Sequence, residues 1–300
     1  MKYIIAIFST VSFIAGAMFF SSLNIVRAAS SPTVVSVVIA TTANGQSDSF
    51  PGGSIDLIAG GTRTVYVNGV VEDLDGKATI VSVSGTLHRS GAPSGDACSA
   101  DTTNCYAVGT CALGDNADPN QKTFSCQMNL LNIAQSTVAG GQFPAENWIA
   151  YVSVTDRETS GTHNATNKEM SSLMSMNIPA AIPFGARDLN EQSTAGNNTE
   201  MVLTQRGNVE SDVEVSMSAA GLACLSGSIP RANVRWSLTD VAYASGTALT
   251  ANPVDTNVYV EYGTAGTPSP TKTLYWNIAI PLDGVGGYCS SAVNVSTIAH

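Results

Sequence analysis

The six cysteines are the residues of this chain whose spacing carries the most chemical information. Cys98, Cys105, Cys111 and Cys126 form one group, and it contains neither a C-x-x-C pair nor a neighbouring pair of histidines. Structural zinc sites usually take their ligands from such closely spaced pairs. The spacing therefore favours disulfide bonds over a metal site.

Four cysteines allow three pairings. The spacing favours Cys98–Cys105, which closes a short turn-like stretch, and Cys111–Cys126, which closes a longer one. Cys224 and Cys289 then remain as partners of each other. In the chain-entropy model, a loop of about 15 residues contributes about 3 kcal/mol and one of about 65 residues about 4 kcal/mol.

Carboxylates offer the other candidate chemistry. Asp73 and Asp75 alternate before Gly76, and Asp156 ends another apolar stretch. Ca²⁺ takes six to eight oxygen ligands, and alternate residues of a strand point to one face. If the protein binds a metal, we therefore expect Ca²⁺, bound by Asp73, Asp75 and Asp156. The competing interpretation is a hairpin turn at Asp75-Gly76 with solvated acids and no ion.

Catalytic motifs are not found in the sequence. Histidine occurs only as His88, His163 and His300, and none of them lies in an H-E-x-x-H arrangement. There is no G-x-S-x-G elbow and no glycine motif typical of nucleotide binding. A Ser-His-Asp triad is assembled from distant positions, so the many Ser and Asp residues carry no information about one. We predict that the protein is not an enzyme and needs no cofactor apart from the Ca²⁺ considered above.

The N-terminus has the layout of an export signal. Lys2 precedes an uncharged run over residues 3–26, and Arg27-Ala28-Ala29 follows with small residues. We expect a signal peptide at residues 1–28, cleaved after Ala28. The run exceeds the roughly 20 residues that cross a bilayer, so an uncleaved anchor through residues 3–26 is the alternative. Either outcome predicts an extracellular or cell-surface protein in which disulfides form.

Composition limits the range of partners. The formal net charge is −10, and only 12% of the residues are charged, about half the usual share. Nucleic-acid binding depends on Lys and Arg contacts to phosphates, so we exclude it. No run outside residues 3–26 reaches membrane-spanning length. The expected partners are an extracellular protein or a glycan, with self-association as a further expectation.

A period of two residues dominates the hydrophobic pattern, which predicts strands. Between the strands lie Gly, Asn, Asp and Pro, and no convincing amphipathic helix occurs, so we predict an all-β sandwich fold. Trp148, Trp236 and Trp276 all fall in these runs, and we expect them in the core rather than on a sugar-binding surface. The expected strands cover residues 64–71, 79–87, 122–133, 148–155, 209–217, 258–262, 273–280 and 292–298.

Two prolines suggest a domain boundary. Pro179 and Pro183 bracket a short connector, since proline fixes φ and cannot donate a hydrogen bond. Four cysteines lie before the connector and two after it, an even number on each side. We predict a first β-sandwich domain at residues 29–181 and a second one at residues 182–300.

The polar stretch from Ser90 to Gln121 is too long for a simple hairpin connection. Loops beyond about 12 to 15 residues in compact domains are usually functional or disordered. Two disulfides argue against disorder, so this stapled stretch of the first domain is the expected recognition surface. The alternative is an insertion that is merely kept rigid against proteolysis.

Several strings resemble bacterial and archaeal secreted cell-surface proteins with immunoglobulin-like domains, of a type found in small uncultured bacteria. In the first half these are Val70-Val71-Glu72-Asp73-Leu74-Asp75-Gly76 and the run from Trp148 to Asp156. In the second half they are Arg206-Gly207-Asn208-Val209, the run from Asp212 to Ser216 and the ending from Leu274. The resemblance implies two immunoglobulin-like β-sandwich domains without catalytic function. Cys289 departs from it, because Ser or Thr is usual after the Gly-Tyr turn.

These observations lead to two functional hypotheses. The first is a non-catalytic recognition or adhesion module at the cell surface, which uses the stretch Ser90–Gln121. The alternative is a structural subunit of an extracellular filament or surface layer. In that case the uncharged, β-rich segment Pro32–Ala40 would add as a strand to a neighbouring sheet.

Overall fold

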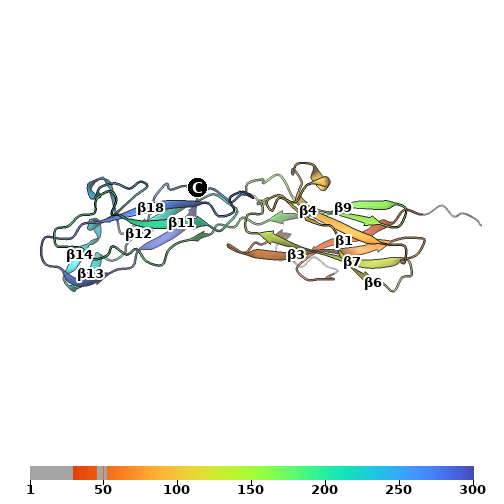
Figure 1. Cartoon of the computed structure of the whole chain (residues 1–300), viewed down its shortest axis with the longest axis horizontal. Helices are drawn as coiled ribbons and strands as arrows, with labels where there is room; N and C mark the ends of the chain where they lie inside the picture. The colour runs from red at the N-terminus through yellow and green to blue at the C-terminus, as the bar shows by residue number, and fades with distance from the viewer. Residues whose placement is uncertain (1–29, 46–49, 51–52) are drawn as a thin grey trace, which may run out of the picture.

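The computed structural model describes residues 30–45, 50 and 53–300, and the expected signal peptide or anchor lies outside them. Within this part the protein is all-β, with mostly antiparallel sheets and three 3₁₀ turns but no α-helix. None of its described helical segments is long and apolar enough to cross a membrane. The strands gather around two hydrophobic cores, which lie end to end in an elongated molecule (Figure 1).

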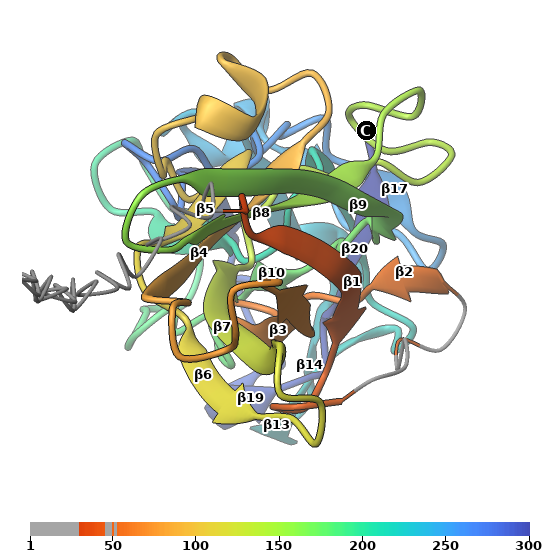
Figure 2. The ribbon, with the colours of Figure 1, turned by 90° about the vertical axis from the view of Figure 1, so that its right-hand side faces the viewer.

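The first body contains two sheets that face each other across the first core (Figure 2). One sheet has the order β1-β3-β7-β6, from β1 (Thr33–Ala40), β3 (Thr62–Glu72), β7 (Gln121–Leu131) and β6 (Ala112–Asp115). The other has the order β2-β9-β8-β4-β5, from β2 (Ser54–Ile55), β9 (Ser160–Met170), β8 (Trp148–Thr155), β4 (Ser82–Arg89) and β5 (Cys105–Val108).

Alternation along the strands explains why the sheets pack face to face. In β8, Trp148, Ala150, Val152 and Val154 are fully buried, while the residues between them are half-buried. Strand side chains point to opposite faces in turn, so one apolar face meets the core. The facing sheet contributes Val65, Val67 and Val71 from β3 in the same way.

The chain crosses between these two sheets in the stretch Ser90–Gln121. This stretch is not one long loop: β5 pairs with β4 in one sheet, and β6 pairs with β7 in the other. The Cys111–Cys126 disulfide lies at the crossing, where the Cys111 N–H also donates to the Val83 carbonyl. The open loop is therefore confined to Ser90–Asn104 and to the turn before β7.

The second body surrounds its own core with three sheets. The largest contains β10 (Met176–Asn177), β11 (Thr199–Gln205), β18 (Thr271–Ile278), β15 (Val234–Ser237) and β16 (Thr247–Ala248). A second contains β17 (Val254–Asp255), β12 (Ser211–Ser216) and β20 (Asn294–Ala299). The third contains β14 (Ser228–Pro230), β13 (Gly221–Ser226) and β19 (Gly286–Ser290).

One expected strand is wrong. Residues 258–262 form only an isolated bridge between Val260 and Ser211. Asn257 and Tyr259 have φ angles of 52° and 41°, which interrupt the extended backbone that a strand requires. The structure also moves the boundary between the two bodies. Strand β10 lies before residue 181, the predicted end of the first domain, but Met176 and Ile178 pack on the second core.

The structure contains three disulfides, Cys98–Cys105, Cys111–Cys126 and Cys224–Cys289, the pairings that the sequence favours. Each bond stays within one body. We therefore expect peptide mapping without reduction to recover these three linked pairs and no free thiol. A bond between Cys224 and any of the first four cysteines would contradict the separation into two cores.

Candidate functional site

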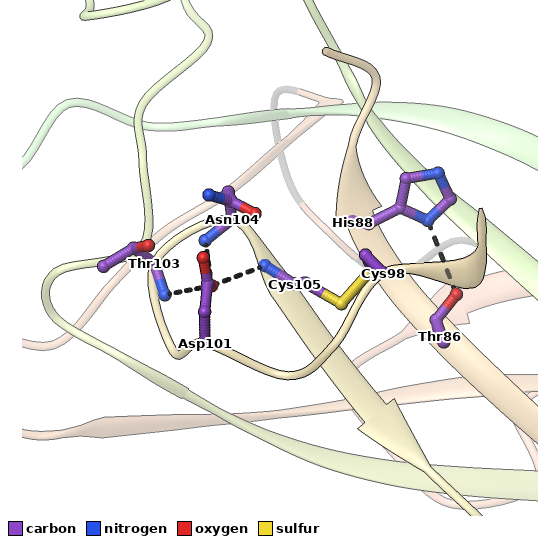
Figure 3. The surroundings of a disulfide bond; sticks show 7 residues. All are labelled: Thr86, His88, Cys98, Asp101, Thr103, Asn104 and Cys105. Atoms are coloured by element: carbon purple, nitrogen blue, oxygen red, sulfur yellow. Dashed lines mark hydrogen bonds between the residues drawn. A yellow bond between two sulfur atoms is a disulfide. The ribbon is translucent and has the colours of Figure 1, made fainter. Parts of the chain in front are cut away.

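The segment Ser90–Asn104, which we call the stapled loop, stands out from the first body above the end of β4 (Figures 1 and 2). It contains one 3₁₀ turn at Gly95–Ala97 and is closed by the Cys98–Cys105 disulfide, whose Cα atoms lie 6.2 Å apart (Figure 3). Cys105 begins β5, so the bond fastens the loop to the sheet.

Asp101 organises the second half of the stapled loop (Figure 3). Its Oδ1 atom accepts hydrogen bonds from the backbone N–H groups of Thr103, Asn104 and Cys105 at 2.9, 2.8 and 3.0 Å. Burial opposes ionisation of the carboxylate, but these donors stabilise the charged form, so the pKa of Asp101 lies below its usual 3.8. Asp101 thereby holds the turn that leads into β5.

An ion pair fixes the root of the stapled loop. Arg89, at the end of β4, is buried and donates to Glu146 through Nη1 and to Gln135 through Nε at 2.8 Å. Its guanidinium lies 3.6 Å from the centre of the Phe143 ring. Glu146 also accepts from the Gly91 N–H at 2.7 Å. A buried charge that is paired in this way holds the loop entrance in one geometry.

Tyr106 ties the stapled loop to the facing sheet. Its hydroxyl donates to the Thr102 carbonyl and accepts from the Leu131 N–H at 3.1 Å. Burial raises the pKa of Tyr106 far above its ordinary value, so the phenol stays neutral. The ring packs against Trp148 with centroids 5.9 Å apart.

His88 lies on β4 beside Cys98 (Figure 3), and among the described residues it belongs to no group of three or more His, Cys, Asp or Glu side chains that could hold a metal ion. It is buried, and its Nδ1 atom lies 3.4 Å from the Thr86 hydroxyl. Burial lowers the pKa of His88, and the charge of Asp96 opposes this effect only in part. The imidazole is therefore neutral near pH 7 and serves to support β4.

Small side chains, with three serine hydroxyls among them, cover the outside of the stapled loop. A rigid surface of hydroxyls and exposed backbone can hydrogen-bond to a partner without a large loss of conformational entropy. The exposed members are Ser90, Gly91, Pro93, Ser94, Asp96, Ala97, Ser99 and Ala100.

The expected Ca²⁺ site is not assembled. Asp73 accepts from the Asp75 N–H at 2.9 Å and from the hydroxyls of Thr79 and Ser30, and Asp75 accepts from the Ser30 N–H at 2.7 Å. Asp156 instead caps its own turn, where it accepts from Glu158 and Thr159. The prediction that these three carboxylates form one group is therefore wrong.

The physical reason is that each carboxylate serves its own local turn: Asp73 and Asp75 accept from Ser30, and Asp156 accepts from Thr159. In the described part of the chain, no group of three or more His, Cys, Asp or Glu residues could hold a metal ion. The hairpin interpretation of Asp75-Gly76 fails as well, since β3 and β4 belong to different sheets and this turn connects them. The turn at Asp73 and Asp75 instead holds Ser30 against the end of the first body that lies away from the second.

The tryptophans offer no sugar-binding platform. Trp148 and Trp276 are fully buried and Trp236 is 7% exposed. Two open hollows of about 440 and 450 Å³ occur elsewhere. One lies beside Leu238 and Tyr275, and the other beside Gly60 and Arg206, so neither is lined by the stapled loop.

Sequence reasoning located the stapled loop through its cysteines but missed the residues that hold its root. Arg89 and Glu146 are 57 positions apart, and no motif connects them. The only hint of this ion pair in the sequence is that Arg89 ends an otherwise uncharged strand, β4. Comparisons with known proteins add no assignment, because no family model and no curated protein matches this chain.

Replacing Asp101 with Asn removes the charge but retains one acceptor oxygen. Because folding lowers the pKa of Asp101, its carboxylate contributes stability above the usual pKa of 3.8 and loses it as pH falls through the lower folded pKa. We expect Asp101→Asn to destabilise the protein near neutral pH, and the difference from wild type to vanish in acid. Urea unfolding at a series of pH values measures this.

The matched control is Asp96→Asn, an exposed carboxylate on the same loop. It should leave the unfolding free energy within about 0.5 kcal/mol of wild type at every pH. Equal effects of the two substitutions would show that the charge of Asp101 does not organise the loop.

Proposed function

We propose that this protein is an exported, non-catalytic recognition module that binds an extracellular protein or glycan through the stapled loop. The observation that carries the proposal is that an exposed loop of mostly small residues is held in one conformation by four separate contacts. These are the Cys98–Cys105 bond, Asp101, the Arg89–Glu146 pair and Tyr106. Binding loops are characteristically mounted on rigid scaffolds in this way.

Export fits the covalent chemistry of the chain. All six cysteines are paired, which indicates folding in an oxidising environment outside the cytoplasm. The signal-like residues 1–28 supply a route to that environment. We assign the protein to the cell surface or extracellular space, with two immunoglobulin-like domains. We place their boundary before β10 rather than between residues 181 and 182, because Met176 and Ile178 pack on the second core.

A structural subunit is the second candidate, and one observation favours it. Strand β1 is the terminal strand of its sheet, and Val35 is 52% exposed at an irregular position of the β1–β3 pairing. An edge strand can pair with another chain. However, β1 is hydrogen-bonded along β3, and Val37 and Ile39 pack in the first core. Transfer of β1 to the sheet of a neighbouring molecule would therefore remove these side chains from the first core.

The recognition proposal is tested with residues 29–300, which contain both cores, on arrays of glycans and extracellular proteins. Ala100→Arg places a bulky charge on the exposed face of the stapled loop and should weaken any specific binding about tenfold or more. Ala195→Arg makes the same change on an exposed turn of the second body and should have no effect. Equal binding by both variants and the wild type would contradict the proposal.

The subunit alternative has its own readout, light scattering of the same protein over a range of concentrations. Val35→Lys places a charge on the edge strand without removing a core residue. If wild-type assemblies form and this substitution dissolves them, assembly through β1 replaces recognition as the leading function. A monomer at every concentration excludes the alternative.

A further inference from the structure

The far end of the second body carries an exposed apolar surface that the stapled loop does not include. Leu225, Leu282 and Tyr288 are 88%, 69% and 82% exposed, among the highest values of the large apolar side chains in the described residues. We call these three residues the apolar tip. Strands β13 and β14 place it at the end of the molecule away from the first body (Figure 1).

The apolar tip is built from two turns in close contact, one after β13 at Gly227 and one before β19 at Gly284. The Cys224–Cys289 bond joins β13 to β19, and Leu225 follows Cys224 at the position where the pairing becomes irregular. A Cβ atom on Gly227 would lie 1.8 Å from the Gly284 carbonyl oxygen, and one on Gly287 would lie 2.7 Å from the Leu225 Cβ. Only glycine permits this approach, so the two turns lie in contact while Leu225 stays exposed at the surface.

The charge and size of the apolar tip restrict its partner. Asp283 is the only charged residue in the segments 218–230 and 281–292 that build it. Three side chains alone do not reach the roughly 800 Å² per partner of a standard protein interface. A lipid bilayer needs no complementary partner surface, and binding to it strengthens with the apolar area that enters the interfacial region.

We propose that the apolar tip inserts into the interfacial region of a zwitterionic lipid bilayer. Tyrosine suits this depth, because its ring is apolar and its hydroxyl remains at the head groups. Asp283 and the overall charge of −10 disfavour anionic lipid, so head groups without net charge are the matching surface. Ser30 is held by Asp73 and Asp75 at the opposite end, so the chain enters the folded part away from this contact.

The test is flotation of residues 29–300 with phosphatidylcholine vesicles. The wild type should float with the vesicles, and the triple variant Leu225→Ser, Leu282→Ser, Tyr288→Ser should lose binding at least about tenfold. The matched control is Leu74→Ser with Val81→Ser, which removes apolar side chains of 67% and 57% exposure from other turns. This control should float as the wild type does.

A second readout does not depend on loss of binding. Tyr288→Trp should show a blue shift of tryptophan fluorescence when vesicles are added, and Leu74→Trp should show none. Absence of wild-type flotation, or equal flotation of the triple variant, would overturn the proposal. Self-association that the triple variant abolishes, without vesicle binding, would assign the tip to a second copy instead. Since the tip shares no residue with the stapled loop, neither result bears on the recognition proposal.

Discussion

The two bodies are joined through one buried asparagine, Asn208, which lies beside the hydrogen bond from the Gly60 N–H to the Arg206 carbonyl at 2.9 Å. Asn208 has no exposed surface: its Nδ2 donates to the carbonyls of Ala134 and Ser171 at 2.7 and 3.0 Å. Its Oδ1 accepts from the Leu173 N–H at 2.7 Å, and its own N–H donates back to the Leu173 carbonyl at 3.0 Å. One side chain of the second body thereby satisfies three backbone groups of the first, each of which would cost about 1–3 kcal/mol if left unpaired. Gly207 allows this approach, because a Cβ there would lie 1.9 Å from the Leu173 oxygen.

The junction at Asn208 sets the positions of the stapled loop, the apolar tip and the turn that holds Ser30. Strand β3 begins next to it and ends at the turn of Asp73 and Asp75, which holds Ser30 at the outer end of the first body. Strand β12 also begins next to it and leads away toward the apolar tip. The stapled loop lies at the junction end of the first body, where β4 ends. A rigid junction therefore presents the loop at the side of an elongated molecule and the apolar tip at its end, with the N-terminal connection at the other end.

Local patterns in the sequence were sufficient for what depends on neighbouring residues. Alternation predicted the run from Trp148 to Thr155 as a strand, and the structure has β8 with the same bounds. Cysteine spacing led to Cys98–Cys105 and Cys111–Cys126, because short loops close most readily, and it left Cys224 and Cys289 as the remaining pair. The remainder depends on contacts between distant residues. Nothing near Arg89 points to Glu146, and nothing near Asn208 points to Leu173. The three carboxylates failed as a site because each serves its own local turn, where they accept hydrogen bonds from Ser30, Thr79 and Thr159, none of which is visible from spacing alone.

The central claim is that both surfaces are carried on one rigid, elongated frame held by Asn208. Small-angle X-ray scattering of residues 29–300 tests it most directly, on the wild type, Asn208→Ala and the control Asn198→Ala. Asn198 donates to the Val241 carbonyl within the second body and does not reach the first. The account predicts that one extended shape fits the wild type and the control, while Asn208→Ala needs a wider range of distances between the bodies at unchanged strand content. A wild-type curve that needs several arrangements, or an Asn208→Ala curve identical to it, would contradict the claim.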